Sequence, residues 1–165
     1  MRKTISAYKV KLNGSYVFLG FLCILYQILG SVFLYMPLLY GVFFCYMYFL
    51  LEERQKTFNK LDFRWYFSLF FLFFTDITYD FFLFSSWLAF VIFYYTCADW
   101  IKTNLKIGKI IPIILVLCVY AFIFILDAIF SYVGDQEFKM PNFGYMISIM
   151  FECLFAYMLY RSKFQ

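Results

Sequence analysis

Five polar residues lie within or beside long apolar stretches of this 165-residue chain: Gln27, Asp76, Asp80, Asp127 and Glu152. An aspartate at the centre of a membrane-spanning helix costs roughly 2.5 to 3.5 kcal/mol on insertion scales. Such a group must be protonated, face a cavity, or meet a polar group elsewhere. Glu152 has only apolar sequence neighbours, which favours a hydrogen bond inside a helix bundle or at a subunit interface over ion or substrate binding.

Asp76 and Asp80 are four residues apart and would share one face of a helix, where paired carboxylates can hold a cation or share a proton. Both lie near the predicted outer water interface, where a carboxylate is hydrated. We therefore expect Asp80 to cap the start of the next helix, and Asp76, which lies deeper, to be solvated or to cap.

Several chemistries are excluded by composition. The chain has no histidine, so catalytic triads, histidine-ligated zinc and imidazole-held haem lose their central residue. Its five cysteines are spread one per apolar segment without a C-x-x-C pair, and we interpret them as buried apolar residues. The sequence predicts no enzyme, no cofactor, no metal site and no nucleic-acid partner.

An intramembrane peptidase is the enzyme class closest to these carboxylates. Tyr79-Asp80 matches half of the presenilin-type signature, but the Gly-x-Gly-Asp half is absent. The stretch 132–135 locally resembles lipoprotein signal peptidases, and Asp127 and Asn142 fit that pattern. The second catalytic aspartate would fall on Tyr145, which argues against this activity.

The apolar stretches themselves predict the fold. Hydrophobic residues make up 65% of the chain and charged residues 15%, and the mean hydropathy is +0.80, which excludes a water-soluble domain and disorder. About 20 helical residues cross a bilayer. We predict an all-α fold, a single transmembrane domain over residues 1–165, with six short helices at about 13–29, 32–51, 64–78, 81–98, 107–133 and 143–160.

The basic residues indicate the orientation, because Lys and Arg near span ends stay in the cytoplasm. Six spans place 13 of the 14 basic residues on one side and leave only Lys139 on the other. Both termini are therefore expected in the cytoplasm. The first helix is expected to be an anchor, since no cleavable signal peptide is evident. The predicted location is the bacterial inner membrane, as a multi-pass protein.

The overall design resembles the MreD family of bacterial rod-shape-determining proteins, which have about 160 residues, six short spans, cytoplasmic ends and a short basic tail. Family members tend to have a proline entering the second helix and an aspartate ending the third, then a hairpin into a leucine-rich fourth helix. Here Pro37, Asp76 and residues 83–89 fall in comparable places, and 160–163 resemble the family's tail.

The resemblance implies a non-enzymatic scaffold subunit of the cell-shape and peptidoglycan elongation complex. Such a protein would contact the lipid bilayer, an MreC-like partner, the cell-wall synthase complex and MreB filaments, and it could also form a homo-oligomer. Asp76 would position the hairpin turn. Helix association in lipid uses small and polar residues, so the expected contact positions are Gly41, Ser85, Ser86, Ala89 and Glu152.

A second function remains open. MreD-like bundles are similar in architecture to the substrate-binding (S) subunits of energy-coupling-factor transporters, which would need an outward-facing polar pocket. The candidates on that side are mostly acidic and would suit a cationic or neutral ligand: Asp76, Asp80, Asp127, Asp135, Gln136, Glu137 and Asn142.

Overall fold

The computed structural model describes residues 14–33, 36–57, 62–104, 110–135 and 143–160, and every regular element in these ranges is helical, which confirms the predicted all-α fold. The helices are α1 (Gly14–Val32), α2 (Tyr40–Thr57), α3 (Phe63–Thr78), α4 (Ser85–Thr96), α5 (Ala98–Asn104), α6 (Ile111–Val133) and α7 (Phe143–Tyr160).

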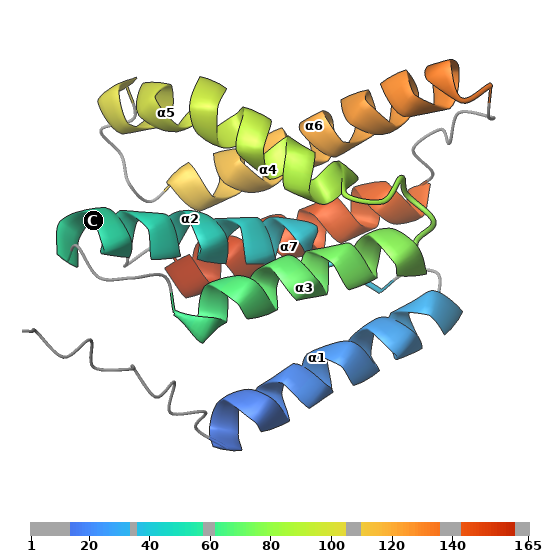
Figure 1. The fold of residues 1–165 in the computed structure, drawn as a ribbon, viewed down its shortest axis with the longest axis horizontal. Helices are drawn as coiled ribbons and strands as arrows, with labels where there is room; N and C mark the ends of the chain where they lie inside the picture. Colours follow the sequence, from blue (N-terminus) through green and yellow to red (C-terminus); the bar gives the residue numbers. More distant parts are fainter. Residues whose placement is uncertain (1–13, 34–35, 58–61, 105–109, 136–142, 161–165) are drawn as a thin grey trace, which may run out of the picture.

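The helices form a bundle in which α2, α6 and α7 pack together, with α4 against α6 and α3 against α2 and α4 (Figure 1). α1 lies outermost and packs against α3. Apart from the short α5, which continues the course of α4, successive helices alternate in direction. We call the end where α2, α4 and α7 begin the polar end, and the end where they finish the basic end.

Aromatic side chains fill much of the interior. Tyr40, Phe44 and Tyr48 of α2 recur every four residues and are almost completely buried. Phe43, on a neighbouring face of the same helix, stacks on Phe71 of α3 with ring centroids 3.8 Å apart. One face of α2 therefore supplies large apolar side chains to the core, as expected for a helix buried against several others.

The predicted ranges of two helices are wrong at both ends. The second helix was expected at 32–51 but runs from Tyr40 to Thr57, because Pro37 lacks an N–H and Leu39 has a left-handed φ of 65°. The fourth was expected at 81–98 but begins at Ser85, after left-handed residues at Asp80 and Phe84, and ends at Thr96 before α5. The remaining four expected ranges correspond closely to α1, α3, α6 and α7, although residues 13 and 107–109 lie outside the described residues.

Within the described residues, two helices are long and apolar enough to cross a membrane by length and composition, namely α6 and α7. The apolar part of α1, Val17–Val32, is shorter. α3 has 16 residues and α4 has 12, and α2 carries charged residues in its last two turns.

Candidate functional site

The chain enters α2 through a short non-helical segment, residues 36–39, at the polar end of the bundle. Leu38 is 2% exposed, so its backbone groups are out of reach of solvent. Its N–H donates to Ser148 Oγ at 2.9 Å, and the N–H of Leu39 donates to Glu152 Oε1 at 2.6 Å. Two side chains of α7 therefore replace the hydrogen bonds that a helix would have made here.

The carbonyl groups of the same segment are bound by α1. Tyr26 donates its hydroxyl to the Pro37 carbonyl at 2.8 Å, and Gln27 Nε2 donates to the Leu38 carbonyl at 3.0 Å. Gln27 Nε2 also donates to Thr75 Oγ1 of α3 at 2.9 Å. Gln27 is fully buried and so joins α1, the α2 entry and α3.

Glu152 caps the first turn of α2 from another helix. Its Oε2 accepts from the Gly41 N–H at 2.6 Å, and its Oε1 accepts from Tyr120 of α6 at 2.5 Å as well as from Leu39. The start of a helix carries unpaired N–H groups and a partial positive charge, which together favour a carboxylate. The fully buried Glu152 thus meets polar groups on two other parts of the bundle.

Asp76 performs a similar role at the start of α4. Its Oδ1 accepts from the Tyr40 hydroxyl at 2.8 Å, and its Oδ2 accepts from the Ser86 hydroxyl at 2.8 Å and the Ser86 N–H at 3.3 Å. Asp76 is fully buried, so its expected solvation is wrong. The expectation that Asp80 caps this helix is also corrected, because Asp80 lies on the exposed turn and Asp76 receives the N–H of α4.

Asp127 of α6 is 2% exposed and brings a third carboxylate to the polar end. It interacts electrostatically with Asp76 and with Tyr145 of α7. Three helices, α3, α6 and α7, therefore each place one acidic residue in the interior, although the sequence separates these residues widely.

The hydrogen bonds of Glu152 and Asp76 define what these buried carboxylates can do chemically. Both oxygens of Glu152 and both of Asp76 accept hydrogen bonds from groups that hold helix starts in place. Among the described residues, no group of three or more cysteines and acids is arranged to hold a metal ion. Asn142, which the peptidase pattern required beside Asp127, lies outside the described residues. The arrangement is that of a structural network joining six helices, α1 to α4, α6 and α7.

Several partners in this network were not singled out by the sequence. Tyr40 and Tyr120 are two of 16 tyrosines, and nothing in their spacing distinguishes them. Ser148 could have been found, because it precedes Glu152 by one helical turn and shares its face. For Ser86, the sequence predicts only a small residue suited to contact a partner, and not a hydrogen-bond donor to Asp76.

The residues expected at a partner interface are instead inside the bundle. Ser85, Ser86, Ala89 and Glu152 are fully buried, and Gly41 is buried as well. They join helices of one chain and are not available to another protein. Any partner surface must therefore use other residues.

We expect Gly41→Ala to destabilise the bundle by about 1 to 3 kcal/mol, the usual cost of overpacking. A Cβ atom at this position would lie 2.7 Å from both Val116 methyl groups and 3.0 Å from Glu152 Oε2. The measurement is the free energy of unfolding in a detergent-to-SDS titration. Val116→Ala makes room for the new methyl group, so the double variant should be destabilised by less than the sum of the two single variants. Simple additivity of the two destabilisations would contradict the steric explanation.

Comparisons of the chain with protein-family models, with curated proteins and with solved structures find no match.

Proposed function

We propose that the chain is a multi-pass protein of the bacterial inner membrane, with six spans and both termini in the cytoplasm. Alternation of helix direction supports this topology, with α4 and α5 together forming the fourth span. Arg54, Lys56 and Arg64 lie at the basic end, which would face the cytoplasm.

The same proposal explains the hydrogen bonds at the α2 entry. Non-helical backbone at membrane depth is tolerated only where protein buries it and satisfies its polar groups. The entry segment meets this condition through Tyr26, Gln27, Ser148 and Glu152. A short α3 and α4 fit a bilayer that thins locally around the protein.

Within that membrane placement, we propose a non-enzymatic scaffold subunit of the cell-shape and peptidoglycan elongation complex, binding an MreC-like partner. The observation that carries the scaffold role is the use of Glu152 and Asp76 as internal caps. Asp76 is one of the outward residues that a substrate-binding subunit would use for a cationic or neutral ligand. Both of its carboxylate oxygens instead accept hydrogen bonds from the chain's own Tyr40 and Ser86, which favours a fixed bundle over a substrate site.

The partner surface that we propose is the outward face of α7. Its inward stripe contains Ser148, Glu152, Ala156 and Tyr160, at a spacing of four. On the other side a second stripe with the same spacing is largely exposed, with Met150 at 68% and Met158 at 76%. Methionine is flexible and polarisable and is frequent at adaptable binding surfaces. The outward stripe consists of Met146, Met150, Leu154 and Met158.

The test is purification of a tagged copy from its native membrane in mild detergent, followed by mass spectrometry of the proteins that accompany it. We expect an MreC-like protein and cell-wall synthases with the wild type. Replacing Met150 and Met158 together by alanine should reduce their recovery at least fivefold without changing the folded yield. The matched control is Phe21→Ala and Leu25→Ala on the exposed face of α1.

Two outcomes would contradict the proposal. Co-purification of paired ATPases with a transmembrane coupling protein would identify a transporter's substrate-binding subunit. Equal loss of partners in the α1 and α7 variants would reject α7 as the specific contact surface.

A further inference from the structure

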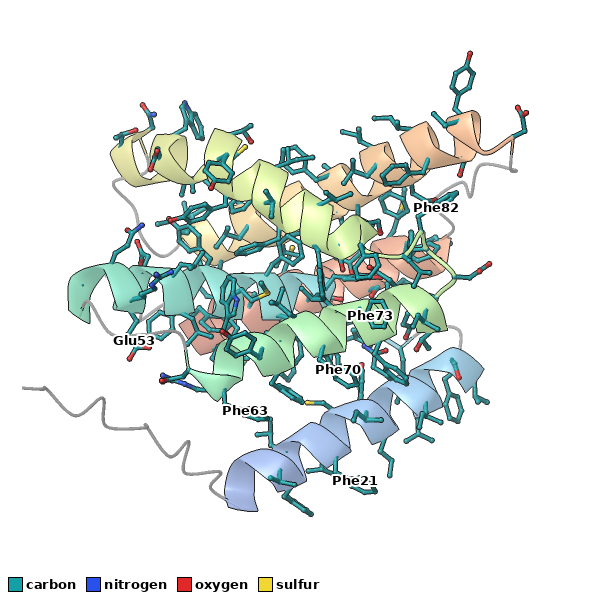
Figure 2. All side chains as sticks on the ribbon, viewed as in Figure 1. Phe21, Glu53, Phe63, Phe70, Phe73 and Phe82 are labelled. Carbon is teal, nitrogen blue, oxygen red and sulfur yellow. The ribbon has the colours of Figure 1, made fainter. Side chains whose placement is uncertain are left out.

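A cavity of about 350 Å³ lies toward the basic end of the bundle, between α1, α2, α3 and α7. Its walls are almost entirely apolar and include Val42, Phe63, Phe67 and Leu159. The labelled Glu53 and Phe63 are both at this end of the bundle in Figure 2. The volume is within the range of small-molecule sites. Glu152 and Asp76 do not line it, so it is distinct from the hydrogen-bond network.

The cavity is partly open toward the outside beside α1. Gly20 allows α1 to approach α3 closely, since a Cβ atom there would lie 3.0 Å from Phe67 Cε2. Leu19, the residue that α1 contributes to the cavity wall, is 54% exposed. In the proposed membrane placement, an acyl chain of the surrounding bilayer is the apolar group that can enter this partly open space and cover its apolar walls.

One charged residue, Arg64, is among the lining residues, and its surroundings carry both signs of charge. Its side chain is 29% exposed, and its Nη2 lies 2.9 Å from Asp62 Oδ2 and 3.6 Å from Glu53 Oε2. Asp62 is the residue before α3 and makes no side-chain cap of that helix. A guanidinium suits a phosphate group, and two adjacent carboxylates suit an ammonium group and disfavour an anion.

We infer that this cavity binds a phospholipid whose headgroup carries a phosphate and a primary amine. One acyl chain occupies the apolar space, the phosphate contacts Arg64, and the ammonium faces Asp62 and Glu53. The site lies at the basic end, so the lipid belongs to the cytoplasmic leaflet. This inference rests on the membrane placement proposed above but not on the identity of any protein partner.

The experiment is native mass spectrometry of the purified, delipidated full-length chain titrated with phosphatidylethanolamine or phosphatidylglycerol of identical acyl chains. We expect wild-type protein to prefer phosphatidylethanolamine at least fivefold. Arg64→Gln should weaken that binding about tenfold, whereas Arg54→Gln, an exposed arginine on α2 outside the cavity lining, should leave it unchanged. Asp62→Asn should shift the preference toward phosphatidylglycerol, and Leu19→Trp, which fills the cavity, should weaken both lipids.

Equal affinity for the two lipids, or equal effects of the two arginine variants, would overturn the headgroup assignment. Unchanged binding in Leu19→Trp would overturn the cavity as the site. Failure of the underlying membrane placement is distinguishable, because the chain would then be recovered without detergent. Membrane-extracted protein that retains no aminophospholipid would contradict this inference alone.

Discussion

Replacing Glu152 by alanine is expected to lower the free energy of unfolding by about 3 kcal/mol or more, the largest effect of any single change considered for this chain. The substitution removes both oxygens that accept from Leu39, Gly41 and Tyr120. Three donors are left without this acceptor, those of Gly41 and Tyr120 buried and that of Leu39 partly buried. Each buried unsatisfied group costs about 1 to 3 kcal/mol. An SDS titration of the purified protein measures the change, with secondary structure as the readout.

The matched comparison for this variant is Asp99→Ala. Asp99 is exposed on α5, and removing an exposed acid usually changes stability by less than about 0.5 kcal/mol. The stability of Glu152→Gln should lie between those of Glu152→Ala and wild type. A carbonyl in the Oε1 position still accepts from Leu39 and Tyr120, while the amide group opposes the N–H of Gly41. A Glu152→Ala protein as stable as Asp99→Ala would show that the capping of α2 contributes little.

The second large effect is expected from Asp76→Asn, which should lower the free energy of unfolding by about 2 kcal/mol. The amide keeps one acceptor oxygen, and its NH₂ group replaces the other. The Ser86 N–H can only donate, so the NH₂ group must be met by a hydroxyl, such as that of Tyr40, turned from donor to acceptor. The measurement is the same titration, followed by hydrogen exchange at the first turn of α4, where loss of the cap should speed exchange.

Asp80 offers an internal control for that prediction. It is the same residue type four positions later, it is exposed, and its φ of 56° is one that asparagine adopts readily. Asp80→Asn should therefore change stability by less than about 0.5 kcal/mol. Equal effects at the two positions would mean that burial and capping do not distinguish them.

The fold class was predictable from the sequence because the apolar stretches are long and punctuated clearly. The helices at 64–78 and 143–160 correspond closely to α3 and α7. The start of α2 was not predictable from hydropathy, since residues 32–39 are apolar whether helical or not. The hydrogen-bond partners that α1 and α7 supply allow this segment to be non-helical in the interior.

The candidate site was predictable in part. Intramembrane acids are costly, and that physical rule singled out Asp76, Asp127 and Glu152, all of which are buried. Their partners depend on which helices meet, and this is long-range information. Gly41 is an example. The sequence predicts it as a small residue that contacts another protein, whereas in the fold Val116 and Glu152 of the same chain pack against it.

The hydrogen bonds at the α2 entry also have a consequence for synthesis. Leu38 and Leu39 donate to residues 110 and 113 positions later in the chain. At about 5 to 20 residues per second, roughly 5 to 20 s pass between translation of the donors and of their acceptors. During that interval the segment's N–H groups must be met by water or by another protein. A nascent chain halted before α7 therefore lacks both Ser148 and Glu152, and the α2 entry then depends most on substitutes for these two acceptors.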